Sequence, residues 1–403
     1  MGNSDTYDLL LKGGHVIDPA NGIDEQRDVA IRSGKIAAVA TGVQESMANN
    51  VVDVTGLHIT PGLIDLHTHH FGAHAEIPPD VYAIPEGVTT VVDAGTSGAE
   101  SFEDFKATVI DKAETRVLAL LNICRSGMIS HAEQDVTQLQ ASPCTVVINE
   151  YTDHIVGIKA AHFDGPGYFG IESAVEAGIA TDKPVMIDYH RHPERNYRGL
   201  LDRLRPGDTH THMYGRHTPQ MDADGKIYDF LLSARERGIQ FDVGHGGFSF
   251  WFSTASKLIP QGHVPTTIST DVHAGSFYIR RATMPAVMSK LINLGISLVD
   301  VVEMSTSAPA AWMKRPEFGN LSVGAVADIA VLELEFGEFG FVDSGMARLK
   351  GDQRLTCQMT VRNGAIVWDL NGLSRPDYEG QGDYVSLDRD MSDLLDWTGY
   401  DNS

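Results

Sequence analysis

Cysteine is scarce in this sequence, and long apolar runs are missing from it. The 403 residues include three cysteines, Cys124, Cys144 and Cys357, which lie far apart and show no CxxC spacing. This pattern argues against a disulfide framework and a zinc ribbon, and it favours a reducing compartment. There is no run of 18 apolar residues and no secretory signal pattern at the start, so we expect a cytoplasmic protein that does not enter a membrane.

Basic residues are also few relative to acidic ones. The chain has 31 Lys and Arg against 54 Asp and Glu, which gives a formal net charge of -23 at pH 7. An electric field of this sign repels phosphate backbones and anionic bilayers, so nucleic acid is not an expected partner. An anionic substrate would need a local cluster of cationic side chains.

The residues that are present describe a folded protein with two ends rich in β-structure. Hydrophobic residues make up 42% of the chain and charged residues 21%, which is the composition of a globular protein. Short β-type segments such as Tyr7–Lys12 alternate with turns near the N-terminus, and a matching stretch begins at Ala327–Leu334. We predict one discontinuous β-sandwich domain from residues 1–59 and 321–370, with residues 371–403 as a C-terminal arm.

The middle of the chain, residues 60–320, alternates apolar β-type runs with helical patterns. This alternation is typical of βα units around a parallel sheet. The candidate strands are Leu63–His67, Thr89–Asp93, Val117–Ile123, Val156–Lys159, Val185–Tyr189, Thr209–His212, Gln240–Val243 and Thr266–Ser269. Eight is the number of strands in a TIM barrel. The predicted fold class is therefore α/β: a (β/α)8 TIM barrel with a small β-sandwich domain formed from both chain ends.

Two histidines, His67 and His69, stand at the end of the first predicted barrel strand. Side chains on a strand alternate between its faces, so these two imidazoles lie on the same side. Two imidazoles on one face at a strand end can share a metal ion. A pair of solvated loop histidines is the alternative.

Three further ionisable residues, Lys159, His212 and Asp271, fall at the carboxyl ends of predicted strands. Active sites of TIM barrels lie on this face. Burial of several ionisable groups together is unfavourable unless a cation or a counter-charge balances them. A metal site explains these residues together, and a salt bridge is the alternative for Lys159.

Several short motifs resemble those of one enzyme family. They are PGLIDLHTH at 61–69, GVTTVVDAG at 87–95, GIK at 157–159, DVGHG at 242–246, STD at 269–271 and GAVADI at 324–329. These motifs resemble the amidohydrolase superfamily, which includes dihydroorotases, hydantoinases and D-aminoacylases, and most of all its deacetylase-like or D-aminoacylase-like branch. The resemblance covers about residues 7–370.

The resemblance implies a set of metal ligands. His67, His69 and Asp271 would hold the more buried metal and His212 the second, while Lys159, carboxylated on its ε-amine, would bridge the two. A buried lysine with a lowered pKa can react with carbon dioxide, and the carbamate is a bidentate anion. The expected cofactor is two zinc ions per subunit, with a single divalent metal as the alternative.

The fifth predicted strand departs from the family pattern. Most relatives have a histidine after a run like Pro184–Ile187, but here Asp188 follows, and His190 comes two positions later. Both side chains share one strand face. We predict that Asp188 or His190 is a metal ligand, and a weak second site with one working metal is the alternative.

Two residues are catalytic candidates. By resemblance, Asp271 would act as general acid/base, taking the proton of a metal-bound hydroxide and passing it to the leaving group. His245, in the GHGG segment after the seventh strand, is a candidate donor of a hydrogen bond to substrate, with a structural histidine in a tight loop as the alternative.

Arginines bring positive charge to the same face. They lie in the loop 191–198 and in the pair Arg280 and Arg281. Arginine forks suit carboxylates, so a carboxylate-bearing small-molecule substrate is an interpretation of this cluster, and a solvated surface is the alternative. Phe248 and the aromatic residues up to Phe252 form either an apolar wall of the pocket or a helix that packs on the barrel.

Taken together, these patterns predict a hydrolase of carbon–nitrogen bonds other than peptide bonds. The predicted reaction is metal-dependent cleavage of an amide or ester bond in a small molecule, such as an N-acyl amino acid or an acylated hydroxy acid. One alternative is a cyclic amidohydrolase similar to dihydroorotases and hydantoinases, and another is a non-catalytic assembly protein on the same scaffold. We expect a homo-oligomer.

Overall fold

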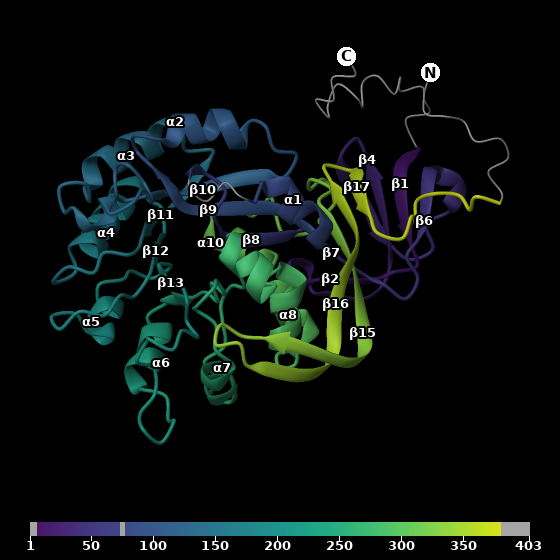
Figure 1. Ribbon diagram of the computed structural model, residues 1–403. Helices are drawn as coiled ribbons and strands as arrows, with labels where there is room; N and C mark the ends of the chain where they lie inside the picture. Colours follow the sequence, from purple (N-terminus) through teal and green to yellow (C-terminus); the bar gives the residue numbers. More distant parts are fainter. Residues whose placement is uncertain (1–5, 73–76, 380–403) are drawn as a thin grey trace, which may run out of the picture.

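A curled parallel sheet forms the centre of the protein in a computed structural model that describes residues 6–72 and 77–379 (Figure 1). Its strands are β8 (Leu63–Thr68), β9 (Val88–Gly98), β10 (Arg116–Asn122), β11 (Ile155–Ala160), β12 (Val185–Ile187), β13 (Thr209–His210) and β14 (Gln240–Phe241). Neighbours along the chain are neighbours in the sheet, and every pair is parallel. All residues of β9 are buried, as its run of valine and threonine favours.

The predicted eighth strand, Thr266–Ser269, is wrong as a regular strand. The segment 266–272 instead forms isolated parallel bridges, from Thr267 to Asp242 on one side and from Val272 to Thr68 on the other. Side-chain hydroxyls of this segment bind buried carboxylates, and Asp271 has a left-handed backbone, so regular strand pairing is interrupted. The segment nevertheless connects β14 to β8 and closes the sheet.

Ten α-helices accompany the sheet in the described ranges. They are α1 (Pro79–Ala83), α2 (Phe102–Phe105), α3 (Ala141–Glu150), α4 (Phe169–Thr181), α5 (Tyr197–Leu201), α6 (Asp229–Glu236), α7 (Phe252–Leu258), α8 (Met284–Ile292), α9 (Leu298–Glu303) and α10 (Ser307–Trp312). Within residues 6–72 and 77–379, no helix combines the length and the apolar character that a membrane crossing requires.

The barrel strands bury apolar side chains on both faces. Val92 of β9 and Leu118 of β10 belong to one cluster with Trp312 of α10, whereas their neighbours Val91 and Val117 belong to a larger cluster that includes the helices α4 and α8. Alternate residues of a strand point to opposite faces, which explains this division. The core therefore supports the strand ends from two sides.

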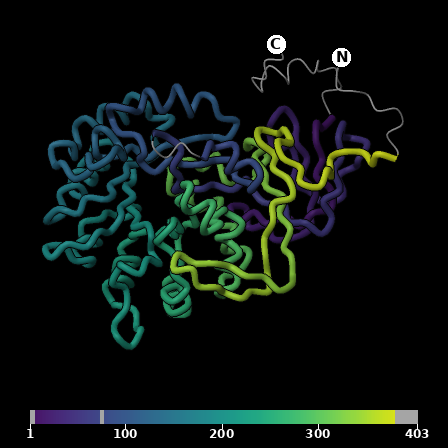
Figure 2. Tube along the Cα trace, in the orientation of Figure 1, coloured from purple at the N-terminus to yellow at the C-terminus, as the bar shows by residue number. Residues whose placement is uncertain are grey.

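Strands from both ends of the chain form two further sheets. The first contains β1 (Tyr7–Lys12), β4 (Asp28–Arg32), β5 (Lys35–Ala40) and β6 (Ala48–Asp53); the second contains β2 (His15–Asp18), β3 (Ile23–Gln26), β7 (His58–Pro61), β15 (Ile329–Val342), β16 (Arg348–Arg362) and β17 (Ala365–Asp369). Leu11 of the first sheet and Ile59 and Val331 of the second share one apolar core. Figure 2 shows the two ends side by side. The predicted domain boundaries stay predictions, and residues 380–403 of the predicted arm lie outside the described ranges.

Strand β15 is longer than the β-type stretch predicted from the sequence. The predicted stretch ends at Leu334, but β15 continues to Val342 and pairs with β16 as far as Arg348. The added part contains exposed charged residues and glycines, which are uncommon in strands, so the sequence pattern does not indicate a strand there. Strand β16 packs against α8, where the amide of Leu355 donates to the hydroxyl of Ser289 (2.9 Å).

Candidate metal centre and active-site pocket

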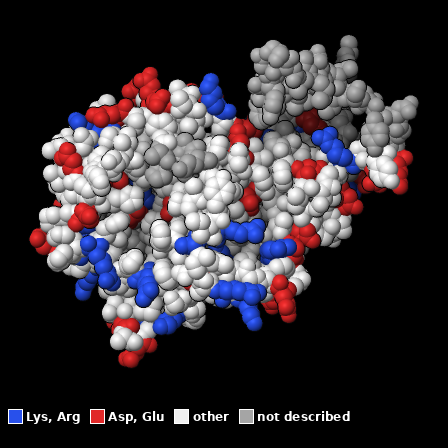
Figure 3. Space-filling view, viewed as in Figure 1, with Lys and Arg blue, Asp and Glu red and all other residues white. Residues whose placement is uncertain are grey.

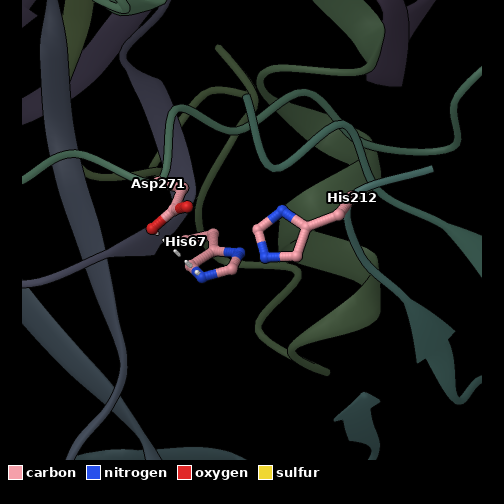
Figure 4. A group of neighbouring side chains, drawn as sticks. All are labelled: His67, His212 and Asp271. Atoms are coloured by element: carbon pink, nitrogen blue, oxygen red, sulfur yellow. Dashed lines mark ion pairs between the residues drawn. The ribbon is translucent and has the colours of Figure 1, made fainter. Parts of the chain in front are cut away.

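The predicted metal ligands come from different strand ends and meet at one edge of the barrel. His67 lies in β8 and Lys159 in β11; Asp188 follows β12, His212 follows β13, and Asp271 lies in the closing segment. Carboxyl ends of parallel barrel strands share one face, which brings these distant residues together. Figure 4 shows His67 between Asp271 and His212.

Asp271 contacts both histidines of the β8 end. Its Oδ1 lies 3.0 Å from Nε2 of His69 and 3.6 Å from Nε2 of His67. Nε2 of His67 also lies 3.3 Å from Nζ of Lys159, which is completely buried. The donor atoms therefore face one another across a small space.

Asp188 extends this group toward the sixth strand. Its Oδ1 lies 2.8 Å from Nζ of Lys159, and its Oδ2 lies 3.6 Å from Nε2 of His212. Of the two candidates after the fifth strand, Asp188 is the one that joins Lys159 and His212.

His190 lies in a second group that shares Asp188. His162, Asp188 and His190 each place a donor atom within 4.8 Å of the others. Nδ1 of His162 lies 2.7 Å from Oε2 of Glu133, a contact that leaves Nε2 of His162 for other partners. The ligand roles of Asp188 and His190 stay predictions, and the structure places the two residues side by side.

Further residues hold the predicted ligands in position, and sequence reasoning missed them. Nδ1 of His212 donates to the carbonyl of Gly244 (2.7 Å), so its Nε2 faces the other donors. Nδ1 of His67 lies 3.1 Å from Oγ1 of Thr211, which donates to the buried carboxylate of Asp242 (2.8 Å). Asp242 is the first residue of the DVGHG motif, and this motif is the sequence feature that could have indicated its role.

Three residues around the site have a left-handed backbone. The φ angles are 56° at His162, 61° at His212 and 49° at Asp271. Such angles are uncommon outside glycine, and residues that keep them cluster at functional sites. The surrounding structure therefore fixes the backbone of these residues against its own preference.

Burial and neighbouring charges set the protonation of the donors. Burial lowers the pKa of His67 well below its usual value, and Lys159 lowers this pKa further. Burial alone would raise the pKa of Asp271, but His67 and His69 outweigh it and keep this pKa low. Lys159 and His212 likewise outweigh burial and lower the pKa of Asp188. Neutral imidazoles and ionised carboxylates are the forms that bind cations, as the pKa shifts of His67, Asp188 and Asp271 favour, whereas Asp188 outweighs burial and raises the pKa of His212.

The donor set fits a divalent metal. His67, His212 and Asp271 offer ligand atoms within 4.8 Å of one another. Imidazole nitrogen and carboxylate oxygen are ligands that zinc accepts. The buried amine of Lys159 stands between an imidazole and a carboxylate, where an anionic carbamate would add oxygen donors.

A pocket of about 480 Å³ opens above these donors. His69, Asp188, His190, His212 and Asp271 line it, and Lys159 lies beneath its surface. Pockets of this size take small molecules. Phe248 is 72% exposed and forms an apolar wall of the pocket, whereas Phe250 and Phe252 are buried in the core. Pocket lining therefore applies to Phe248, and packing on the barrel applies to Phe250 and Phe252.

The predicted arginine cluster divides into separate places. Arg191 is the one Lys or Arg among the described lining residues of the pocket. Its Nε donates to the carbonyl of His217 (2.8 Å). Arg195 is buried and donates to backbone carbonyls of four residues, so it holds loops together. Arg280 and Arg281 line another cavity.

His245 lies outside the lining of the pocket. It is 0% exposed, its Nδ1 donates to the carbonyl of Gly246 (2.9 Å), and its Nε2 lies 2.7 Å from Nζ of Lys290. Both ring nitrogens are thus engaged within the protein. The catalytic role of His245 stays a prediction, and this placement favours the structural alternative.

Several known proteins are similar to this chain in sequence and fold. A deacetylase of Enterococcus faecalis is 32% identical over 364 residues, which cover 86% of this chain and 95% of the relative. The crystal structure of an adenine deaminase is 30% identical, with a TM-score of 0.81 over 90% of this chain and 100% of that one. The crystal structure of a dihydroorotase is 26% identical, with a TM-score of 0.78 over 90% and 99% of the two chains. No family model matches the chain.

The chain therefore belongs to the amidohydrolase superfamily. The predicted fold class, a TIM barrel with added β-sheets from both ends, is confirmed. The predicted enzyme class, a hydrolase of carbon–nitrogen bonds, is confirmed as well, and the protein is a metal-dependent hydrolase.

Gly246 offers a test of how closely Asp271 must be placed. A Cβ added to Gly246 would lie 2.3 Å from Oδ2 of Asp271, so Gly246→Ala should displace this carboxylate. We expect kcat to fall about 10²-fold, because displacements near 1 Å have this effect in active sites. Gly262→Ala is the matched control, since Gly262 also has positive φ but has nothing within 4 Å of the added Cβ. Equal kcat values for the two variants in a steady-state assay would contradict the expectation.

Proposed function

We propose that the protein hydrolyses the acyl bond of a small molecule that carries a carboxylate, an N-acyl amino acid or an acylated hydroxy acid. The observation that carries this proposal is that Asp271 and Arg191 line the same pocket. If the substrate carboxylate binds the Arg191 guanidinium, the rest of a small substrate extends through the pocket toward Asp271. Arginine recognises carboxylates through paired hydrogen bonds, which supports this orientation.

The metal would be held by the buried donors at the base of the pocket. His67, His69, carboxylated Lys159, His212 and Asp271 supply these donors by resemblance, with Asp188 beside Lys159 and His190 next to it. The set supports two zinc ions per subunit. When bound, such ions act as Lewis acids that polarise a carbonyl and make a water molecule acidic near neutral pH.

Asp271 would move the proton in this reaction. Its carboxylate accepts a proton from the attacking water as the water oxygen bonds to the acyl carbon. The same carboxyl group then gives this proton to the departing nitrogen or oxygen as the bond to the acyl carbon breaks. The low pKa of Asp271 keeps it ionised before the reaction. Phe248 would shield the acyl group from solvent.

A second candidate is the opening of a cyclic amide. The similarity to a dihydroorotase structure favours it, and it would use the same donors with another fit in the pocket. A non-catalytic assembly protein would have no use for a set of potential metal ligands at the base of a pocket.

We further propose a cytoplasmic homo-oligomer, and the exposed Phe336 and Met346 of the β15–β16 hairpin support an association surface.

A substrate screen tests the proposed function. Zinc-loaded protein is offered N-acetyl, N-formyl and O-acetyl acids of both hands, with a hydantoin and a dihydropyrimidine as cyclic substrates. We expect hydrolysis of a linear acid, and we expect Asp271→Asn to reduce its kcat about 10²- to 10⁴-fold, the usual contribution of general acid–base catalysis. Turnover of the cyclic compounds alone would support the second candidate instead.

The proposed carboxylation of Lys159 can be tested through the zinc content of the protein, which does not depend on catalytic activity. We expect Lys159→Ala to lose bound zinc, measured by elemental analysis after dialysis, because the bridging donor is removed. Added propionate should restore part of the metal, since its carboxylate can enter the space of the missing side chain. Lys112→Ala at the exposed surface is the control. Unchanged zinc content in Lys159→Ala would show that this residue is no ligand.

Arg191 tests the expected charge of the substrate. Arg191→Ala should raise KM for a carboxylate-bearing substrate about tenfold or more, because a charged hydrogen bond contributes about 1.5 to 3 kcal/mol. The methyl ester of the same substrate should be affected little. Arg198→Ala is the matched control, since Arg198 is exposed and does not line the pocket. An equal effect on acid and ester would contradict recognition of the carboxylate by Arg191.

A further inference from the structure

A second pocket lies between helix α8, the residues just before it and the β15–β16 hairpin. Its volume is about 550 Å³, and it shares no lining residue with the active-site pocket. A cavity of this size takes a small organic molecule. Figure 3 shows Lys and Arg side chains gathered on the face over α8 and the hairpin.

The lining of this pocket is cationic in a strongly acidic protein. It includes Arg280, Arg281, Lys290 and Arg354, with Glu86 as the carboxylate among the described lining residues. Arg354 is committed to a bidentate ion pair with Glu335, at 3.0 and 2.7 Å. Within residues 6–72 and 77–379, the other three cations form no ion pair with a carboxylate, and Glu86 acts on Arg281 from a longer distance, so an anionic ligand can still pair with them.

Lys290 is the most unusual member of this set. It is 1% exposed, and its Nζ lies 2.7 Å from Nε2 of His245, a neutral partner. A buried ammonium without a paired carboxylate is unfavourable unless an anion balances it. Burial lowers the pKa of Lys290 to about 7, and Asp343 opposes this change from a longer distance. An anion in the pocket would supply the missing counter-charge.

Apolar side chains complete the lining. Phe341 and Leu355 come from the hairpin, and Trp368 comes from β17. A ligand that satisfies both kinds of surface has one anionic group and an apolar body. Inorganic ions would meet the cations but leave the apolar wall without a partner.

The same cations contact the loop that packs on Asp271. Lys290 meets His245, and Nε of Arg280 donates to the carbonyl of Gly247 (3.2 Å). Gly246, between these two positions, lies directly against the carboxylate of Asp271. Gly247 also lines the active-site pocket. The two pockets are therefore joined by three consecutive residues.

We propose that the pocket between α8 and the β15–β16 hairpin binds a small organic anion with an apolar body, and that this anion slows hydrolysis. The anionic group takes up hydrogen bonds of Arg280, Arg281 and Lys290. Arg280 and Lys290 then no longer hold the loop 245–247 in its position against Asp271. The binding step stands apart from the proposed function, and only the slowing of hydrolysis rests on it.

Calorimetric titration of the zinc-loaded enzyme tests the binding step. The probes are benzoate and phenyl phosphate, which distinguish a carboxylate from a phosphate ligand, and neutral benzamide. We expect one of the anions to bind and benzamide not to bind. Absence of binding by both anions at about 1 mM, or equal binding of benzamide, would overturn the proposal.

Variants assign the binding to this pocket. Arg281→Asn removes a charge, and asparagine tolerates the left-handed backbone found there, with φ of 48°. It should weaken the anion about tenfold or more, as loss of a charged hydrogen bond does. Lys290→Met, of similar length, should have the same effect, and thermal unfolding checks that both variants fold. Arg191→Ala should leave the affinity unchanged; loss of binding in Arg191→Ala alone would place the anion in the active-site pocket and refute the assignment.

The effect on hydrolysis is measured with the better probe. At saturating anion we expect kcat/KM of the wild type to fall about fivefold or more, within the usual range of coupling between sites, and Arg281→Asn to show no fall. Full binding with unchanged kcat/KM would refute the coupling through the loop. If no substrate of the screen is hydrolysed, the proposed function fails, while the titrations still decide whether the pocket binds an anion.

Discussion

The position of Asp271 depends on two buried carboxylates, Asp65 and Asp242, that hold the segment closing the barrel. Asp65 accepts hydrogen bonds from the amide and the hydroxyl of Thr270, and Asp242 accepts one from the hydroxyl of Ser269. Burial raises the pKa of Asp65 to about 7 and also raises the pKa of Asp242. Hydroxyl and amide groups supply the hydrogen bonds of Asp65 and Asp242, so neither carboxylate needs a lysine or arginine as its partner. Since Ser269 and Thr270 are tied to opposite neighbours, Asp271 enters the site in one orientation.

The parts of the site that strand order determines were predictable from the sequence. His67 and Lys159 stand at the carboxyl ends of barrel strands, and Asp271 follows the segment that closes the barrel, so barrel geometry brings the three residues to one face. Residues further into the loops were not predictable in this way, because sequence position does not fix the direction of a loop side chain. His245 contacts Lys290 and Arg280 donates to the carbonyl of Gly247, and neither side chain lines the active-site pocket. The closing segment was predicted as a strand, but side-chain hydrogen bonds hold it in place of regular strand pairing, and a sequence pattern does not reveal such bonds.

Charge in this protein is distributed unevenly in a way that net composition hides. The chain is acidic overall, yet both pockets described above contain cationic side chains. Arg191 lines the active-site pocket, and Arg280, Arg281 and Lys290 line the pocket between α8 and the β15–β16 hairpin. An acidic exterior repels anions at long range, while a few cationic side chains that line the cavities attract them at short range. Selection of a ligand therefore depends on fit within the cavity more than on attraction from a distance.

The pairing of β7 with β15 joins residues 58–61 to residues 329–332. This contact closes a loop that contains the entire barrel, and closing a long loop carries an entropic cost that stable local contacts must first offset. During synthesis, β7 leaves the ribosome long before its partner exists, and its neighbour β2 protects only one of its edges. The barrel strands, which pair with their successors, can assemble as they emerge. The second sheet is therefore completed last, when synthesis has passed Asp369, and β7 exposes an edge to other chains until β15 has been made.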